Sequence, residues 1–189
     1  TDPGMRFAVM FLDLDRFKVV NDSLGHFYGN ELLREVGRRI QQCLRRKEVV
    51  ARLGGDEFAV LLHDLHDSDD GTGLAERILQ ALSKPLPIGG TEIVPSASIG
   101  VTFSDLGYRT ADELLRDADL AMYEAKTAGR GRVAVFDRTM HERIADKLAL
   151  EADLRHAIGE GAQTHSYQPP FALHQDRLVG IEALARWQH

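Results

Sequence analysis

Four acidic residues in two short clusters are the strongest candidates for chemistry in this sequence. Asp13 and Asp15 flank Leu14 at the end of an apolar run, and Asp56 and Glu57 directly follow a Gly-Gly pair. Carboxylates held close together repel one another unless a cation lies between them. Mg²⁺ (or Mn²⁺) suits carboxylate and phosphate oxygens, and two such ions can activate a hydroxyl for in-line attack on phosphorus. The two clusters predict this chemistry if the fold brings them together.

Residues suited to phosphate binding stand at the ends of two predicted helices. The stretch 14–22, LDRFKVVND, opens a helix whose first backbone N–H groups can hold phosphates. Lys126 and Arg130 lie one turn apart at the end of another helix and can clamp a triphosphate. Taken singly, each feature has a simpler explanation as a turn, a hairpin tip or a favourable charge at a helix C-terminus.

Hydrophobic periodicity predicts the elements that must position these residues. The apolar run from Met5 to Leu14 is typical of a buried strand, and the apolar stretches 49–51 and 58–62 around Gly54 and Gly55 predict a hairpin. Capping boxes at Thr110 and Thr139 open two helices. The remaining ranges are helices over 30–44, 74–82, 110–128 and 139 to 159 or 161, a loop over 63–70, and strands over 92–103, 133–136, 166–169 and 178–187.

Composition excludes several classes of protein. The chain has 189 residues, 43% of them hydrophobic and 28% charged, which is typical of a folded globular protein. Its net charge of −6 argues against a general nucleic-acid binder, and the single Cys43 fits a reducing cytoplasm. No apolar run approaches the ~20 residues of a membrane span, so we expect no direct membrane contact. A membrane anchor in a longer parent protein stays open.

Three motifs in order carry a family resemblance. The stretches FLDLDRFKVVNDSLGH (11–26), RLGGDEFAVLL (52–62) and DADLAMYEAKTAGRGRV (117–133) resemble the signatures of the GGDEF family, the diguanylate cyclases. The resemblance covers residues 5–137. It implies an α+β, palm-like nucleotidyl cyclase fold, with a mixed, mostly antiparallel sheet flanked by helices. It also implies that two GTP condense to cyclic di-GMP with release of two pyrophosphates, at a site between the domains of a homodimer.

The resemblance assigns the metal and the catalytic roles. Asp13 and Asp56 would hold Mg²⁺, together with the backbone carbonyl of Leu14. Glu57 would support the metals or help to deprotonate the attacking 3′-hydroxyl. Lys126 would act on the triphosphate in the reaction.

The resemblance also assigns the binding of the nucleotide. Asp15, Arg16 and Phe17 would present backbone N–H groups to the phosphates, while Lys18, Lys126 and Arg130 would neutralise them. Gly54 and Gly55 would let the backbone approach the nucleotide closely.

Three departures from the family pattern bear on function. The guanine-reading pair is Asn21 and Asn30, where the family usually has Asp at the second position, so we expect weaker guanine selectivity. The product-inhibition motif Arg-x-x-Asp is represented by Arg45 and Glu48, which predicts a weakened inhibitory site for cyclic di-GMP, although a plain basic helix end fits equally well. Family domains normally open with a helix and a turn before the first strand, and only residues 1–4 precede that strand here, so we expect this fragment to lack part of the frame of the nucleotide site.

The end of the chain resembles the opening of a second family, the EAL phosphodiesterases. The stretch SYQPPFAL and the stretch LVGIEALARWQH carry this resemblance, with Glu182 at the position of the first metal ligand of that barrel. We therefore expect a GGDEF domain over 1–137, a connector helix over 138–161 and truncated EAL strands over 162–189. The alternatives to catalysis are a GTP-binding module that regulates an attached EAL domain, and a purely structural dimerisation domain, which leaves the acids unexplained.

Overall fold

The computed structural model describes residues 6–169, 171–172, 177–178 and 180–187, with the backbone alone for the two short pairs. The chain forms two compact units, Thr1–Met140 and His141–His189. Of the predicted features, residues 1–5 and parts of the EAL-like tail lie outside the described residues. No described helix is long and apolar enough to cross a membrane.

A five-stranded sheet in the order β2-β3-β1-β6-β7 forms the centre of the first unit. Its strands are β1 (Ala8–Leu14), β2 (Val49–Gly54), β3 (Glu57–Leu62), β6 (Ala97–Phe103) and β7 (Val133–Val135). All neighbours pair antiparallel except β6 and β7, which pair parallel. The prediction of a mixed, mostly antiparallel sheet is confirmed.

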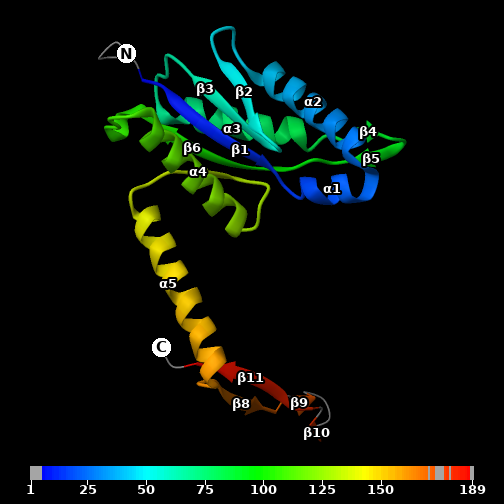
Figure 1. The fold of residues 1–189 in the computed structure, drawn as a ribbon, viewed down its shortest axis with the longest axis vertical. Helices are drawn as coiled ribbons and strands as arrows, with labels where there is room; N and C mark the ends of the chain where they lie inside the picture. The colour runs from blue at the N-terminus through cyan, green and yellow to red at the C-terminus, as the bar shows by residue number, and fades with distance from the viewer. Residues whose placement is uncertain (1–5, 170, 173–176, 179, 188–189) are drawn as a thin grey trace. The chain divides into compact units, whose positions relative to one another are not determined.

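Helices cover both faces of this sheet (Figure 1). Helices α2 and α3 pack on one face, and α4 packs against β6 and β1 on the other. The helix bounds are α1 (Phe17–Leu24), α2 (His26–Cys43), α3 (Ser68–Leu82) and α4 (Ala111–Thr127). A small hairpin, β4 (Leu86–Ile88) with β5 (Thr91–Ile93), and a 3₁₀ turn (Ser104–Leu106) complete the unit.

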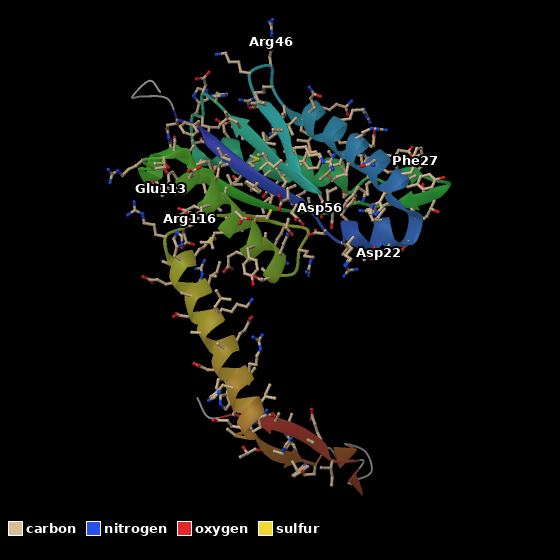
Figure 2. The ribbon with its side chains drawn as sticks, in the orientation of Figure 1. Asp22, Phe27, Arg46, Asp56, Glu113 and Arg116 are labelled. Atoms are coloured by element: carbon tan, nitrogen blue, oxygen red, sulfur yellow. The ribbon has the colours of Figure 1, made fainter. Side chains whose placement is uncertain are left out.

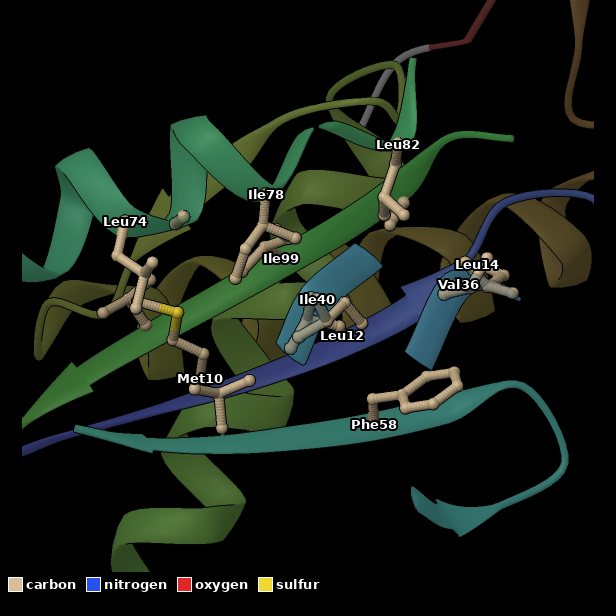
Figure 3. Close-up of a cluster of buried hydrophobic side chains, with 14 of the residues drawn as sticks. Met10, Leu12, Leu14, Val36, Ile40, Phe58, Leu74, Ile78, Leu82 and Ile99 are labelled. Atoms are coloured by element: carbon tan, nitrogen blue, oxygen red, sulfur yellow. The ribbon is translucent and has the colours of Figure 1, made fainter. Parts of the chain in front are cut away.

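Side chains of β1 alternate between the two faces of the sheet, which places some in the core and sets the direction of Asp13. Met10 and Leu12 are buried on the α2 and α3 side with Ile40 and Ile78 (Figure 3). Side chains at odd positions of β1 point to the opposite, α4 face. Asp13 therefore leaves the sheet on the side of α4, the helix that carries Lys126.

The second unit contains most of α5 (Thr139–Glu160) and an antiparallel pair, β8 (Thr164–Gln168) with β11 (Glu182–Arg186). The backbone also pairs β9 (Phe171–Ala172) with β10 (Arg177–Leu178). The long helix is confirmed. Helix α5 starts at Thr139 itself, because the Asp137 carboxylate accepts the Thr139 amide at 2.8 Å.

Several element boundaries differ from prediction for local reasons. Helix α3 starts earlier than expected because the Asp67 carboxylate accepts the Asp70 N–H at 3.0 Å and caps it. The predicted strand over 92–103 breaks between β5 and β6, where Pro95 lacks the N–H that a ladder requires. The box at Thr110 is present in part, since its hydroxyl oxygen accepts the Glu113 amide at 3.2 Å.

Candidate active site

The pairing of β1 with β3 brings the two acidic clusters to one end of the sheet. Asp13 lies directly opposite Glu57 in the ladder, so both side chains share a face. The Leu14 amide donates to the Asp56 carbonyl at 3.3 Å and ties the hairpin turn to the end of β1. Figure 2 shows Asp56 at this end of the sheet, next to the start of α1. The hairpin therefore lies beside the first strand, as convergence of the acids requires.

The surroundings of Asp13 disfavour its ionised form. Burial raises the pKa of its carboxyl above the ordinary value, and the negative charges of Asp56 and Asp15 raise it further. The Lys126 ammonium opposes this by lying 2.7 Å from Asp13 Oδ2, with the Asp13 side chain only 13% exposed. Lys126, from the end of α4, therefore partly neutralises the clustered negative charge in this structure.

The predicted metal ligands do not form a closed cage. Among the described residues, no group of three or more His, Cys, Asp or Glu side chains is arranged to hold a metal ion. Asp13 is engaged by Lys126, and Glu57 is its cross-strand neighbour. Mg²⁺ commonly takes one or two protein carboxylates and fills its other positions with substrate phosphates and water. The Asp13 and Asp56 pair fits this donor set, and so does the Leu14 carbonyl oxygen.

The first residues of α1 suit phosphate binding. Arg16 caps the helix in the left-handed conformation, with φ 59°. Within the described part of the chain, the amides of Arg16, Phe17 and Lys18 donate to no protein acceptor. A cavity of about 390 Å³ opens here, and Arg16, Phe17 and Arg130 are among its lining residues. Arg16 and Phe17 at the start of α1 thus share one cavity with Arg130 from the loop after α4, whereas Lys18 and Lys126 do not line it.

Asp15 departs from its predicted role. Its backbone N–H, expected to face a phosphate, donates to the Ser96 carbonyl at 2.9 Å. Its carboxylate accepts the hydroxyls of Ser96 at 2.6 Å and Ser98 at 2.7 Å, and the Gly131 amide at 3.0 Å. The expectation for the Asp15 amide is corrected, because the carbonyl of Ser96, the residue before β6, already accepts from that donor. Sequence reasoning missed these serines, whose only signal was their alternation within the predicted strand over 92–103.

The two asparagines of the predicted base site differ in exposure. Asn30 is exposed on α2, whereas Asn21 Oδ1 is buried and accepts no hydrogen bond from the described residues. Asn21 lies against Gly29, where an added Cβ would come 1.9 Å from Asn21 Oδ1. A buried acceptor without a partner is costly, so this atom suits a ligand donor. Neither asparagine lines the cavity at the start of α1.

The glycine turn between β2 and β3 is held by its own strand. Gly55 has φ 49°, a conformation that favours glycine. Arg52 donates to the Gly55 carbonyl from Nε at 2.9 Å and from a terminal nitrogen at 2.7 Å. Gly54 and Gly55 are exposed, so their backbone is open to a ligand at the tip.

The two residues of the predicted inhibitory motif, Arg45 and Glu48, hydrogen-bond to each other. Glu48 accepts the Arg45 amide at 2.6 Å, and the Arg45 carbonyl accepts the Glu48 amide at 3.0 Å. The Arg45 guanidinium lies 3.8 Å from Asp70, with its side chain 66% exposed. Glu48 therefore closes the turn before β2, which leaves Arg45 as the accessible member of the pair.

Comparison with known proteins gives a consistent match. Residues 1–132 match the family model described as "Diguanylate cyclase, GGDEF domain". The chain is 42% identical over 184 residues to the bifunctional diguanylate cyclase/cyclic di-GMP phosphodiesterase MucR of Pseudomonas aeruginosa. The match covers 97% of this chain and 27% of that protein. It is 40% identical over 183 residues to the cyclic di-GMP phosphodiesterase PdeR of Escherichia coli, covering 97% of this chain and 27% of that protein. The chain thus spans about a quarter of the length of these relatives.

Solved structures agree in fold. A GGDEF domain of YfiN (TpbB) from Pseudomonas aeruginosa superimposes with a TM-score of 0.72 at 38% identity, covering 74% of this chain and 82% of that one. An EAL/GGDEF domain protein from M. capsulatus has a TM-score of 0.67 at 42% identity, covering 72% and 88%. The strand order, the three motifs and these matches together show that the chain belongs to the GGDEF family.

Proposed function

We propose that the first unit is a diguanylate cyclase domain that condenses two GTP to cyclic di-GMP. The observation that supports this most is the arrangement of Asp13, Asp56 and Lys126 at the end of β1, beside the open amides that begin α1. A domain that only mediates dimerisation has no need to bury repelling carboxylates. Because the reaction consumes GTP, we place the domain in the cytoplasm.

Asp13 and Asp56 hold the metal in this proposal, with the Leu14 carbonyl as a further ligand and Glu57 supporting them. When bound, Mg²⁺ or Mn²⁺ screens the carboxylates and polarises the reacting phosphate. With a metal ion bound, Asp13 would serve as its ligand instead of pairing with Lys126. The Lys126 ammonium becomes free to neutralise the triphosphate.

The remaining positive charge comes from α1 and from the loop after α4. Lys18 and Arg130 neutralise the phosphates, and the amides of Arg16 and Phe17 donate to phosphate oxygens. These fixed donors hold the α-phosphorus for in-line attack. Gly54 and Gly55 let the hairpin approach the nucleotide.

The reaction requires two nucleotides and therefore two domains. The 3′-oxygen of one GTP forms a bond to the α-phosphorus of the other, and the bond from that phosphorus to the β-phosphate oxygen breaks. Glu57 helps to remove the hydroxyl proton, and pyrophosphate leaves. A second, symmetric attack closes the ring and releases the second pyrophosphate. A homodimer supplies the two facing sites.

The base site and the inhibitory site are both altered in this proposal. Asn21 and Asn30 read the guanine edge, with weaker selectivity than an Asp at the second position gives. Cyclic di-GMP acts as a weak inhibitor at Arg45, because Glu48 is committed to the turn. The GGDEF domain of DgcB from Caulobacter crescentus has been solved in complex with c-di-GMP, at 28% identity to this chain.

The second unit is proposed to be the start of an EAL domain joined by α5. The match to MucR covers 97% of this chain and so continues past the GGDEF match, which ends at residue 132. The division into a domain over 1–137, a connector over 138–161 and truncated strands over 162–189 stays a prediction.

Pyrophosphate release from GTP with Mg²⁺ tests the proposal. The wild-type chain should release pyrophosphate, and Asp56→Asn should abolish release because one metal carboxylate is lost. Asp119→Asn is the matched control, since Asp119 is exposed on α4 and should behave as the wild type.

GTP binding measured in parallel separates catalysis from regulation. Binding without pyrophosphate release would replace the cyclase with the alternative, a GTP-binding module that controls an attached EAL domain. Failure of both would reject any nucleotide role for the site.

A further inference from the structure

We propose that Asp15 is a positioning residue whose carboxylate fixes the loop 128–132 and thereby aims Arg130 at the triphosphate. The inference rests on the proposed function only in taking the triphosphate as the ligand of Arg130. The clamp itself follows from the contacts of the described residues.

The Asp15 carboxylate joins three segments that are distant in sequence. Ser98, completely buried in β6, donates to Oδ1 at 2.7 Å, and Ser96 donates to Oδ2 at 2.6 Å. The Gly131 amide donates to the same Oδ2 at 3.0 Å. Hydrogen bonds to a charged acceptor are among the stronger ones in proteins. One side chain therefore fastens the loop after α4 to the ends of β1 and β6.

The loop needs such a fastening because its backbone is unusual. Gly129, Arg130 and Gly131 are all left-handed, with φ of 121°, 63° and 60°. For Arg130, a residue with a Cβ, this conformation is unfavourable and persists only when the surroundings hold it. The Arg130 amide donates to the Ala125 carbonyl at 3.0 Å, and the next amide along the chain is the one held by Asp15. Asp15 therefore constrains the backbone directly after Arg130.

The simplest rival explanation predicts an effect of the opposite sign. If Asp15 were only a negative charge near the phosphates, removing it would strengthen GTP binding, because like charges repel. If Asp15 positions Arg130, removing its oxygens weakens binding. Asp15→Asn separates the two explanations, because the amide keeps one acceptor oxygen while losing the charge.

GTP affinity in the full chain, measured by calorimetry with Mg²⁺, is the first test. Asp15→Ala should weaken binding by about tenfold, the scale of losing a hydrogen bond to a charged group. Asp15→Asn should bind GTP at least about threefold more tightly than Asp15→Ala. Tighter binding by both variants would overturn the proposal. Asp119→Ala, on the exposed face of α4, is the control.

A double-mutant cycle links the effect to the arginine. In an Arg130→Ala background, Asp15→Ala should change GTP affinity by less than about twofold, because no guanidinium is left to misplace. A full tenfold effect in that background would show that Asp15 acts by another route and overturn the proposal.

Hydrogen exchange at the Gly131 amide tests the clamp without nucleotide. Exchange should be faster in Asp15→Ala than in the wild type. It should be slower in Asp15→Asn than in Asp15→Ala. Unchanged exchange in Asp15→Ala would overturn the clamp even if GTP is turned over. A chain that binds no GTP but shows the exchange pattern would reject the proposed function and keep the clamp.

Discussion

At the scale of single residues, the site depends on groups whose charge or hydrogen-bonding pattern is unfavourable until a ligand arrives. Asp13 is largely buried near the negative charges of Asp56 and Asp15, and Asn21 Oδ1 is buried with no donor among the described residues. Both features are typical of sites where stability is sacrificed for function. The acids were predictable from sequence because their types and spacing are local. The Asp15 contacts were not, because Ser96 and Ser98 lie 81 and 83 positions away.

Replacing Asp13 by Asn should stabilise the fold in a pH-dependent way. Burial raises the pKa of Asp13 in the folded chain, so its ionised form opposes folding. That penalty is absent at pH 3, where the carboxyl is protonated, and appears as the pH rises through the raised pKa. The thermal midpoint of Asp13→Asn should therefore exceed that of the wild type at pH 7 and equal it at pH 3. A lower midpoint at pH 7 would mean that the Lys126 ion pair outweighs the burial.

Asn30→Asp should sharpen the preference for guanine. A carboxylate accepts from both guanine N1–H and the 2-amino group, whereas it repels the N1 lone pair of adenine. The gain should be about 1–3 kcal/mol, or roughly 5- to 150-fold in the ratio of ATP to GTP dissociation constants. Gln42→Glu adds the same charge at an exposed position of the same helix and is the control. An equal ratio in wild type and Asn30→Asp would contradict the assignment of Asn30.

At the scale of elements, the site is built by strands and helices whose close packing aligns their ends. Periodicity predicted the helix α4 and the hairpin between β2 and β3 well, because each carries its own capping or turn residues. It did not predict β4 or the gap before β6, where a single proline interrupts an otherwise strand-like stretch. It also said nothing of which helix covers which face, since that depends on packing between distant segments.

Gly100→Ala should separate β6 from α4 and destabilise the domain. An added Cβ would lie 2.1 Å from the Ala118 carbonyl oxygen and 2.2 Å from the Met122 nitrogen, both backbone atoms that cannot turn aside. We expect a loss of about 3 kcal/mol in chemical denaturation, the upper range for overpacking. Gly37→Ala is the control in α2, where the new Cβ would make an ordinary 3.5 Å contact with Phe58. That substitution should be neutral or stabilising by up to ~1 kcal/mol.

At the scale of the whole molecule, the chain combines a first unit that carries the proposed site with a smaller second unit. Residues Thr1–Met140 contain the sheet and every residue of the proposed site, and His141–His189 form a separate contact unit. The proposed reaction needs two nucleotides held in two domains. Catalysis should therefore depend on how often two chains meet.

Specific activity should rise with protein concentration. If two chains form each active site, the rate per chain increases until the dimer is saturated, and then becomes constant. The measurement is pyrophosphate release per chain over a hundredfold range of concentration. A rate per chain that stays flat while sedimentation shows a monomer throughout would contradict a shared site.

The most direct measurement is the identity of the product formed from GTP and Mg²⁺, determined by chromatography and mass spectrometry. The account predicts cyclic di-GMP with two pyrophosphates per molecule, formed by the wild type and not by Asp56→Asn. Adding ATP should yield some mixed dinucleotide, and Asn30→Asp should reduce it. Unchanged GTP that is nevertheless bound would contradict the central claim and identify the domain as a GTP-binding regulator.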